Sequence, residues 1–174
     1  MKMLMKSLAI SMIAITCFTI DASAQKKKKA DKAMHVFRYE IECMGTGVQG
    51  TYLIKVWSYS KKATIAQEWS KKDAIHGVIF KGFAGANGCQ SQKPLSRNPD
   101  LMQEQEAFFD EFFDTKTGGY RQFVNLTTDG VPSAGDVQKV GKEYKVGLVV
   151  SVNKDALRKY LEDKGIIKGL ASGF

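Results

Sequence analysis

The stretch VFRYEIEC, residues 36–43, decides the fold together with TYLIKVWSY, residues 51–59. In the first stretch apolar and charged residues alternate, as is typical of a half-buried strand. The apolar face consists of Phe37, Tyr39, Ile41 and Cys43. The second stretch is rich in aromatic and β-branched residues, which strands favour. Glycines at positions 45, 47 and 50 mark a turn between them, so the two stretches predict a β-hairpin.

The rest of the chain alternates between helical and strand patterns. Helical periodicity predicts helices over residues 62–80, from Pro99-Asp100 through residue 113, and over residues 154–164. Further strands are predicted over residues 120–126, 136–140 and 143–152. Short turns between strands imply mainly antiparallel pairing. We therefore expect residues 34–174 to form a single α+β domain, a two-layer sandwich with about five strands and about three helices.

The N-terminus has the pattern of a secretory signal peptide. Lys2 and Lys6 precede an apolar run over residues 8–20, and Ala22-Ser23-Ala24 offers small residues to a signal peptidase. We expect cleavage after Ala24 and a periplasmic or secreted mature protein. An outer-membrane lipoprotein at Cys17 is the less favoured alternative, because residues 15–16 lack the small residue expected before a lipidated cysteine. No transmembrane segment is expected after signal removal, because no later stretch approaches about 18 consecutive apolar residues.

The formal net charge of +8 is concentrated near the N-terminus. Residues 25–33 carry five lysines and one aspartate, and we interpret them as a Lys-rich disordered spacer. Such a run can bind anionic lipid headgroups or nucleic acid. Because an exported protein meets little nucleic acid, we expect no nucleic-acid partner.

Two cysteines remain after signal removal, Cys43 and Cys89. An oxidising compartment lets a disulfide persist. The sequence leaves two alternatives open: a Cys43–Cys89 disulfide, or two buried free thiols acting as small apolar side chains.

The pattern GTGVQG at residues 45–50 matches a G-x-G-x-x-G dinucleotide fingerprint in its letters only. That fingerprint must open a helix. Here it opens the strand predicted over residues 51–59, so we interpret it as a hairpin connection and expect no cofactor. His76 could pair with Cys89 or Cys43 in nucleophilic catalysis, but no cysteine-protease signature surrounds either cysteine. The chain has no pair of Cys or His residues at the close spacing, such as C-x-x-C or H-x-x-x-H, that would predict a metal site.

The segment from Glu104 to Asp114 combines five carboxylates with four phenylalanines. At helical spacing the carboxylates line the side away from the rings, which favours a solvated face over an acid–base or cation site. The rings, Phe108, Phe109, Phe112 and Phe113, are most simply core. If part of them is exposed, they form the best candidate docking patch in the chain.

Residues 39–50 and 63–82 resemble a known family in the order of their predicted elements. The strand and helix predicted within residues 144–161 are consistent with that resemblance. The order of strand, Gly-rich break, strand and Ala-containing helix resembles small envelope domains of the LPP20 lipoprotein family and the N-terminal domain of flagellar assembly protein T. The resemblance implies a periplasmic accessory or scaffold domain with no catalytic residues to carry over.

We therefore expect an exported cell-envelope accessory or interaction domain, without catalytic activity, that binds an envelope protein partner. The alternative is a small secreted hydrolase or ligand-binding protein that uses a cleft near His76 and Cys89.

Overall fold

The computed structural model describes residues 37–86, 89–127 and 129–169. The predicted signal peptide and Lys-rich spacer lie outside the described residues. In the described part, the strands are β1 (Tyr39–Thr46), β2 (Thr51–Ser60), β3 (Val124–Leu126), β4 (Val137–Val140) and β5 (Glu143–Asn153). The α-helices are α3 (Ala63–His76), α4 (Leu101–Glu104), α5 (Glu106–Phe112) and α6 (Lys154–Asp163). The prediction of an α+β fold with a five-stranded antiparallel sheet is confirmed.

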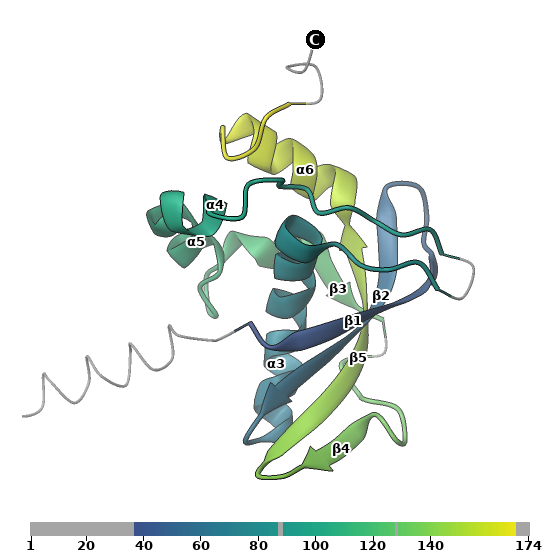
Figure 1. Cartoon of the computed structure of the whole chain (residues 1–174). Coiled ribbons are helices and arrows are strands. Elements are labelled where there is room, and N and C mark those ends of the chain that lie inside the picture. The colour runs from purple at the N-terminus through teal and green to yellow at the C-terminus, as the bar shows by residue number, and fades with distance from the viewer. Residues whose placement is uncertain (1–36, 87–88, 128, 170–174) are drawn as a thin grey trace, which may run out of the picture. The chain divides into compact units, whose positions relative to one another are not determined.

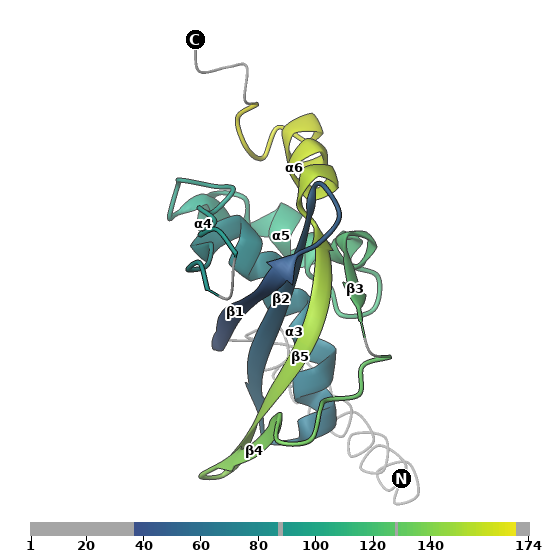
Figure 2. The same cartoon turned by 90° about the vertical axis from the view of Figure 1, so that its right-hand side faces the viewer.

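The sheet has the order β1-β2-β5-β3, with β4 also paired to β5 (Figure 2). β2 and β5 pair antiparallel along their whole lengths, from Thr51 opposite Asn153 to Ser60 opposite Tyr144. β1 pairs with β2 as the predicted hairpin, with a register shift between Cys43 and Gly45. The G-x-G-x-x-G pattern therefore connects two antiparallel strands, as a hairpin requires.

Helix α3 lies across one face of the sheet (Figures 1 and 2). Small residues spaced four apart on this helix are buried, namely Ala66, Ser70 and Ala74, and so is Gly77, which directly follows the helix. Small side chains let the helix backbone come close to the strands. Ala66, for example, packs with Val146 and Leu148 of β5. On a helical projection, Ile65 falls on the same side as Ile75 and Ile79, yet Ile65 is 38% exposed whereas the other two are fully buried.

The predicted helix 62–80 is present but changes its winding. After α3, residues Gly77–Lys81 form a π-helical turn, η1, and Gly82 ends it with a positive φ of 66°. A Cβ on Gly77 would overlap Cδ1 of Ile41 on β1. Glycine at this position is therefore what lets the end of the helix pack against the hairpin.

Two other elements differ from their predicted forms. The helix predicted from Pro99-Asp100 to residue 113 is divided into α4 and α5 at Gln105, whose φ of −117° and ψ of 36° are not helical. The strand predicted over residues 120–126 is mostly a 3₁₀-helix, η2 (Gly119–Phe123), followed by the short β3. Tyr120 and Phe123 are both buried, because residues three apart point the same way in a 3₁₀-helix.

The opposite face of the sheet carries no helix in the described ranges (Figures 1 and 2). Its centre is Trp57, whose ring lies against Gly147 on β5, where a Cβ would come within 2.9 Å of the indole. The ammonium groups of Lys55 and Lys145 each lie 4.9 Å from the Trp57 ring centroid. Lys145 also pairs with Glu40 at 2.7 Å. On this face the lysine side chains therefore cover Trp57, which is only 8% exposed, and ion pairs and cation–π contacts hold them there.

Among the described residues, no helix is both long enough and apolar enough to cross a membrane.

Candidate functional site

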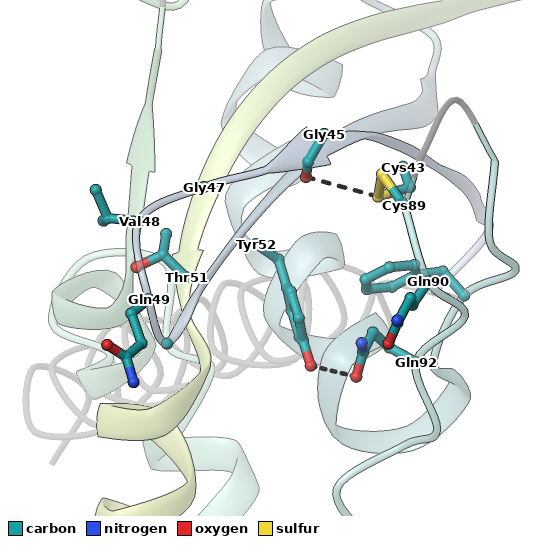
Figure 3. A pocket seen from close by; sticks show the side chains of 12 residues that line it. Cys43, Gly45, Gly47, Val48, Gln49, Thr51, Tyr52, Cys89, Gln90 and Gln92 are labelled. Carbon is teal, nitrogen blue, oxygen red and sulfur yellow. Dashed lines mark hydrogen bonds between the residues drawn. A yellow bond between two sulfur atoms is a disulfide. The ribbon is translucent and has the colours of Figure 1, made fainter.

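A pocket of about 210 Å³ lies between the β1–β2 hairpin and the segment that follows η1 (Figure 3). One wall is the glycine-rich hairpin, from Cys43 to Tyr52, and the other comprises Phe83 and the segment from Cys89 to Gln92. Two parts of the chain far apart in sequence therefore build one hollow.

A disulfide between Cys43 and Cys89 joins the two walls. Their Cα atoms are 6.2 Å apart, within the usual range for a bridge. Cys43 is buried in the core with 3% exposure, whereas Cys89 is half-buried. Of the two alternatives that the sequence left open, the structure has the disulfide rather than two free thiols.

Backbone geometry after η1 brings Cys89 to the hairpin. Phe83 and Gln92 exchange two backbone hydrogen bonds, of 3.0 and 2.9 Å, which fold this segment back on itself. Gly82 lies at the start of this chain reversal, and a Cβ on Gly82 would overlap the carbonyl oxygen of Gln92. The positive φ and the close approach both favour glycine at this position.

The pocket lining is uncharged and mostly apolar, with a few polar side chains. It includes the side-chain amides of Gln49, Gln90 and Gln92. The hydroxyl of Tyr52 donates a 2.5 Å hydrogen bond to Oε1 of Gln92, as Figure 3 shows, and the Tyr52 ring packs edge-on against Phe83 at 5.1 Å. None of the lining residues carries a charge, so this site suits a neutral group rather than an ion.

The hairpin carries two exposed apolar side chains, one of which lines the pocket. Val48, which lines the pocket at the turn, is 80% exposed, and Met44 on β1 is 40% exposed. Large apolar side chains this exposed are candidate contacts for a partner.

His76 lies apart from this pocket, in an aromatic enclosure. Its ring stacks on Phe37 at 3.6 Å between centroids and contacts Phe80 at 4.8 Å, and His76 is only 7% exposed. Nδ1 of His76 is 2.6 Å from the hydroxyl oxygen of Tyr39. His76 is not among the residues that line the Cys89 pocket.

Buried polar residues surround this enclosure. The hydroxyl of Ser58 donates a 2.5 Å hydrogen bond to Asp73, and both residues are fully buried. Burial, and then the charge of Asp73, raise the pKa of the Tyr39 phenol, which stays neutral. Burial lowers the pKa of Lys72, although nearby carboxylates oppose this shift. The Lys72 ammonium lies 5.4 Å from the ring centroid of Phe37.

The phenylalanines proposed as a docking patch are core. Phe109, Phe112 and Phe113 are 1%, 3% and 3% exposed, and Phe108 is half-buried. Their rings pack on one another and on Tyr120 and Tyr160. Three of the four rings are therefore core, which the sequence favoured, and among the four only Phe108 keeps partial exposure.

The acidic residues of this segment form a solvated face. All five carboxylates are exposed: Glu104, Glu106, Asp110, Glu111 and Asp114. Two of them, with Asp100, line a shallow hollow of about 480 Å³ beside α4. Within the described residues, no group of three or more His, Cys, Asp or Glu side chains is placed to hold a metal ion.

Sequence reasoning found the cysteines and the glycine-rich turn but missed Tyr52, Gln90 and Gln92. Tyr52 belongs to the strand pattern, and the two glutamines lie in a segment that the pattern marks only as a loop. Their role depends on a chain reversal and a disulfide that no local pattern encodes.

Comparisons with protein-family models, with curated proteins and with solved structures gave no match to this chain.

Proposed function

We propose that the chain is an exported accessory domain of the cell envelope that acts by binding a partner protein. The contact surface is the hairpin end around Met44 and Val48, with the adjoining uncharged pocket. The observation that carries this proposal is the 80% exposure of Val48 beside a pocket fixed by a disulfide. An apolar side chain at the rim of a preformed hollow offers a partner both burial and shape.

Two features support export. The first is the leader pattern ending at Ala24, and the second is the disulfide, which persists in oxidising compartments. The layout resemblance to LPP20-type envelope domains points in the same direction. Export is tested by cell fractionation and by the mass of the mature protein. We expect a periplasmic or secreted chain that begins at Gln25. A full-length chain retained in the cytoplasm contradicts the proposal.

A site-specific photo-crosslinker tests the partner contact. It is placed at Val48 in growing cells and, as a matched control, at Val140 on β4, another valine with 48% exposure. We expect a discrete crosslinked envelope protein from Val48 and none from Val140. Identical products from both positions, or no product from Val48, would reject the hairpin end as the interface.

A charge substitution gives an independent test. Val48→Asp places a carboxylate at the proposed interface and is expected to abolish the crosslinked complex when the probe sits at Met44. Val140→Asp is expected to leave it intact. Since both valines are exposed, neither variant disturbs the core, and circular dichroism of the purified proteins checks this.

A further inference from the structure

The two cysteine residues of the bridge differ in their exposure to solvent. Cys43 is 3% exposed and belongs to the core cluster, whereas Cys89 is half-buried and packs only at its edge. Both cysteines line the pocket, and Figure 3 shows the bridge beside the pocket residues Gln90 and Gln92. Thiol–disulfide exchange depends on access to the attacked sulfur. Cys89 is the more exposed of the two residues, and we therefore take its Sγ as the sulfur that an incoming thiol reaches.

We propose that the Cys43–Cys89 disulfide is a thiol–disulfide exchange site, attacked at Sγ of Cys89 by an external dithiol of the kind that a thiol–disulfide oxidoreductase carries. The incoming thiolate forms a bond to Sγ of Cys89, and the electron pair of the old S–S bond leaves on Sγ of Cys43. The second thiol of the reagent then attacks the mixed disulfide and releases Cys89. The dithiol is oxidised to a disulfide, and its two protons pass to Cys43 and Cys89.

The pocket suits the approach of the attacking thiolate. None of the pocket-lining residues is a carboxylate, and the Asp155 carboxylate, which adjoins Gly50 at the hairpin turn, pairs with Lys154 at 3.2 Å. Sγ of Cys43 lies 3.7 Å from the carbonyl oxygen of Gly45 and 4.0 Å from that of Leu53. Once reduced and protonated, the Cys43 thiol has acceptors already in place, although thiols donate weakly.

Reduction does not cut the only tie between the two pocket walls. The hydrogen bond from Tyr52 to Gln92 still links them, and the Phe83–Gln92 backbone pair still folds the second wall. We therefore expect the reduced protein to remain folded, with Cys89 as the reactive thiol and Cys43 enclosed in the core.

The experiment traps the mixed disulfide. Oxidised protein is incubated with an oxidoreductase whose second active-site cysteine is replaced by serine, and the adduct is mapped by mass spectrometry after non-reducing digestion. We expect a one-to-one adduct on Cys89. An adduct on Cys43, or formation of the adduct only in urea, overturns the proposal. This result is independent of the partner contact at Val48, which is tested in the oxidised protein.

Single variants supply the second measurement. Cys43→Ser leaves Cys89 free, and Cys89→Ser leaves Cys43 free. In folded protein we expect an uncharged alkylating reagent to modify Cys89 at least about tenfold faster than Cys43, since a buried thiol reacts only after local opening. Each rate is divided by the alkylation rate of the same variant in urea, which removes differences in the intrinsic reactivity of the two thiols. Equal normalised rates overturn the proposal even if one variant is less stable.

Discussion

The hydroxyl oxygen of Tyr39 on β1 lies 2.6 Å from Nδ1 of His76, the last residue of α3. This contact joins the edge strand of the sheet to the helix that covers it, at the point where α3 passes into the π-helical turn. Both residues are buried, with exposures of 8% and 7%. A buried hydrogen bond contributes little net stability to the fold. Removing one partner, however, leaves the other polar group buried without that hydrogen bond, which lowers the stability much more.

Tyr39→Phe is expected to lower the free energy of unfolding by about 1–2 kcal/mol, because it removes a buried partner of the His76 ring. Urea denaturation followed by circular dichroism measures the loss. The control is Tyr59→Phe, which removes a hydroxyl bonded to Glu40 at an exposed site and is expected to cost less. Equal losses of unfolding free energy in the two variants would show that burial does not increase the contribution of the Tyr39 contact to stability.

Gly77→Ala is expected to destabilise the fold by about 1–3 kcal/mol, the usual cost of overpacking, because its Cβ would overlap Cδ1 of Ile41. Gly119→Ala is the matched control, since its Cβ finds its nearest neighbour at 3.5 Å. Adding Ile41→Val to Gly77→Ala removes the obstructing methyl group. The double variant should therefore recover part of the loss in thermal denaturation, and failure to recover would place the strain elsewhere.

The disulfide predicts no free thiol in the mature, denatured and non-reduced protein. Counting thiols with a chromogenic reagent checks this, and two free thiols would contradict the bridge. Because the bridge spans 46 residues, loop-closure entropy gives it at most roughly 4 kcal/mol of stability. Cys43→Ser combined with Cys89→Ser should lower the urea midpoint accordingly.

The pair formed by Glu40 and Lys145 predicts a pH dependence. The hydrogen bond from Lys145, and then that from Tyr59, lower the pKa of Glu40 from its ordinary value of 4.5. A lowered carboxyl pKa stabilises the fold above that ordinary value, and this stability disappears as the pH falls through the folded-state pKa. The difference in unfolding free energy between wild type and Glu40→Gln should therefore be present at pH 7 and vanish in acid.

A double-mutant cycle checks the assignment of that pH dependence. In Lys145→Gln, the further change Glu40→Gln should have a much smaller effect at pH 7 than it has in the wild type. An unchanged effect would show that the pKa of Glu40 is set by something other than this pair.

Lys72→Met is expected to stabilise the protein at pH 7. Because burial lowers the pKa of the ammonium, the folded state disfavours the charged form, and an apolar side chain of similar length removes that cost. The loss of its contacts with the Phe37 and Phe113 rings works against this gain. A rise in melting temperature is the expected net result, and a clear fall would show that the cation–π contacts dominate.

Two of the predicted strands, β2 and β5, were placed to within a residue at each end, because a strand with one buried face must alternate. β1 was predicted over residues 36–43 but runs from Tyr39 to Thr46, three residues later at its C-terminal end. The helix predicted over residues 62–80 was also placed well. On its apolar side Ile75 and Ile79 are fully buried, but Ile65 is exposed. Near the start of the helix the sheet instead packs against small residues, Ala66 and Ser70.

Sequence periodicity predicted the structure least well where the same residues can form more than one kind of local structure and tertiary packing selects between them. Residues 120–126 read as a strand, yet Tyr120 and Phe123 are both buried when the backbone winds as a 3₁₀-helix. The four phenylalanines near residue 110 could have been surface or core. Only the seating of α5 against Tyr120 and Tyr160 decided that they are core.

By itself, the sequence determined the hairpin, the α+β class and the pair of cysteines available for a bridge, because alternation, glycine placement and residue type are local properties. Only the tertiary structure decided that Cys43 meets Cys89, that His76 lies in an aromatic enclosure away from them, and that Gln90 and Gln92 face the hairpin. These relationships depend on chain segments that are distant in sequence, and it is the reversal at Gly82 and the packing of α3 on the sheet that bring them together.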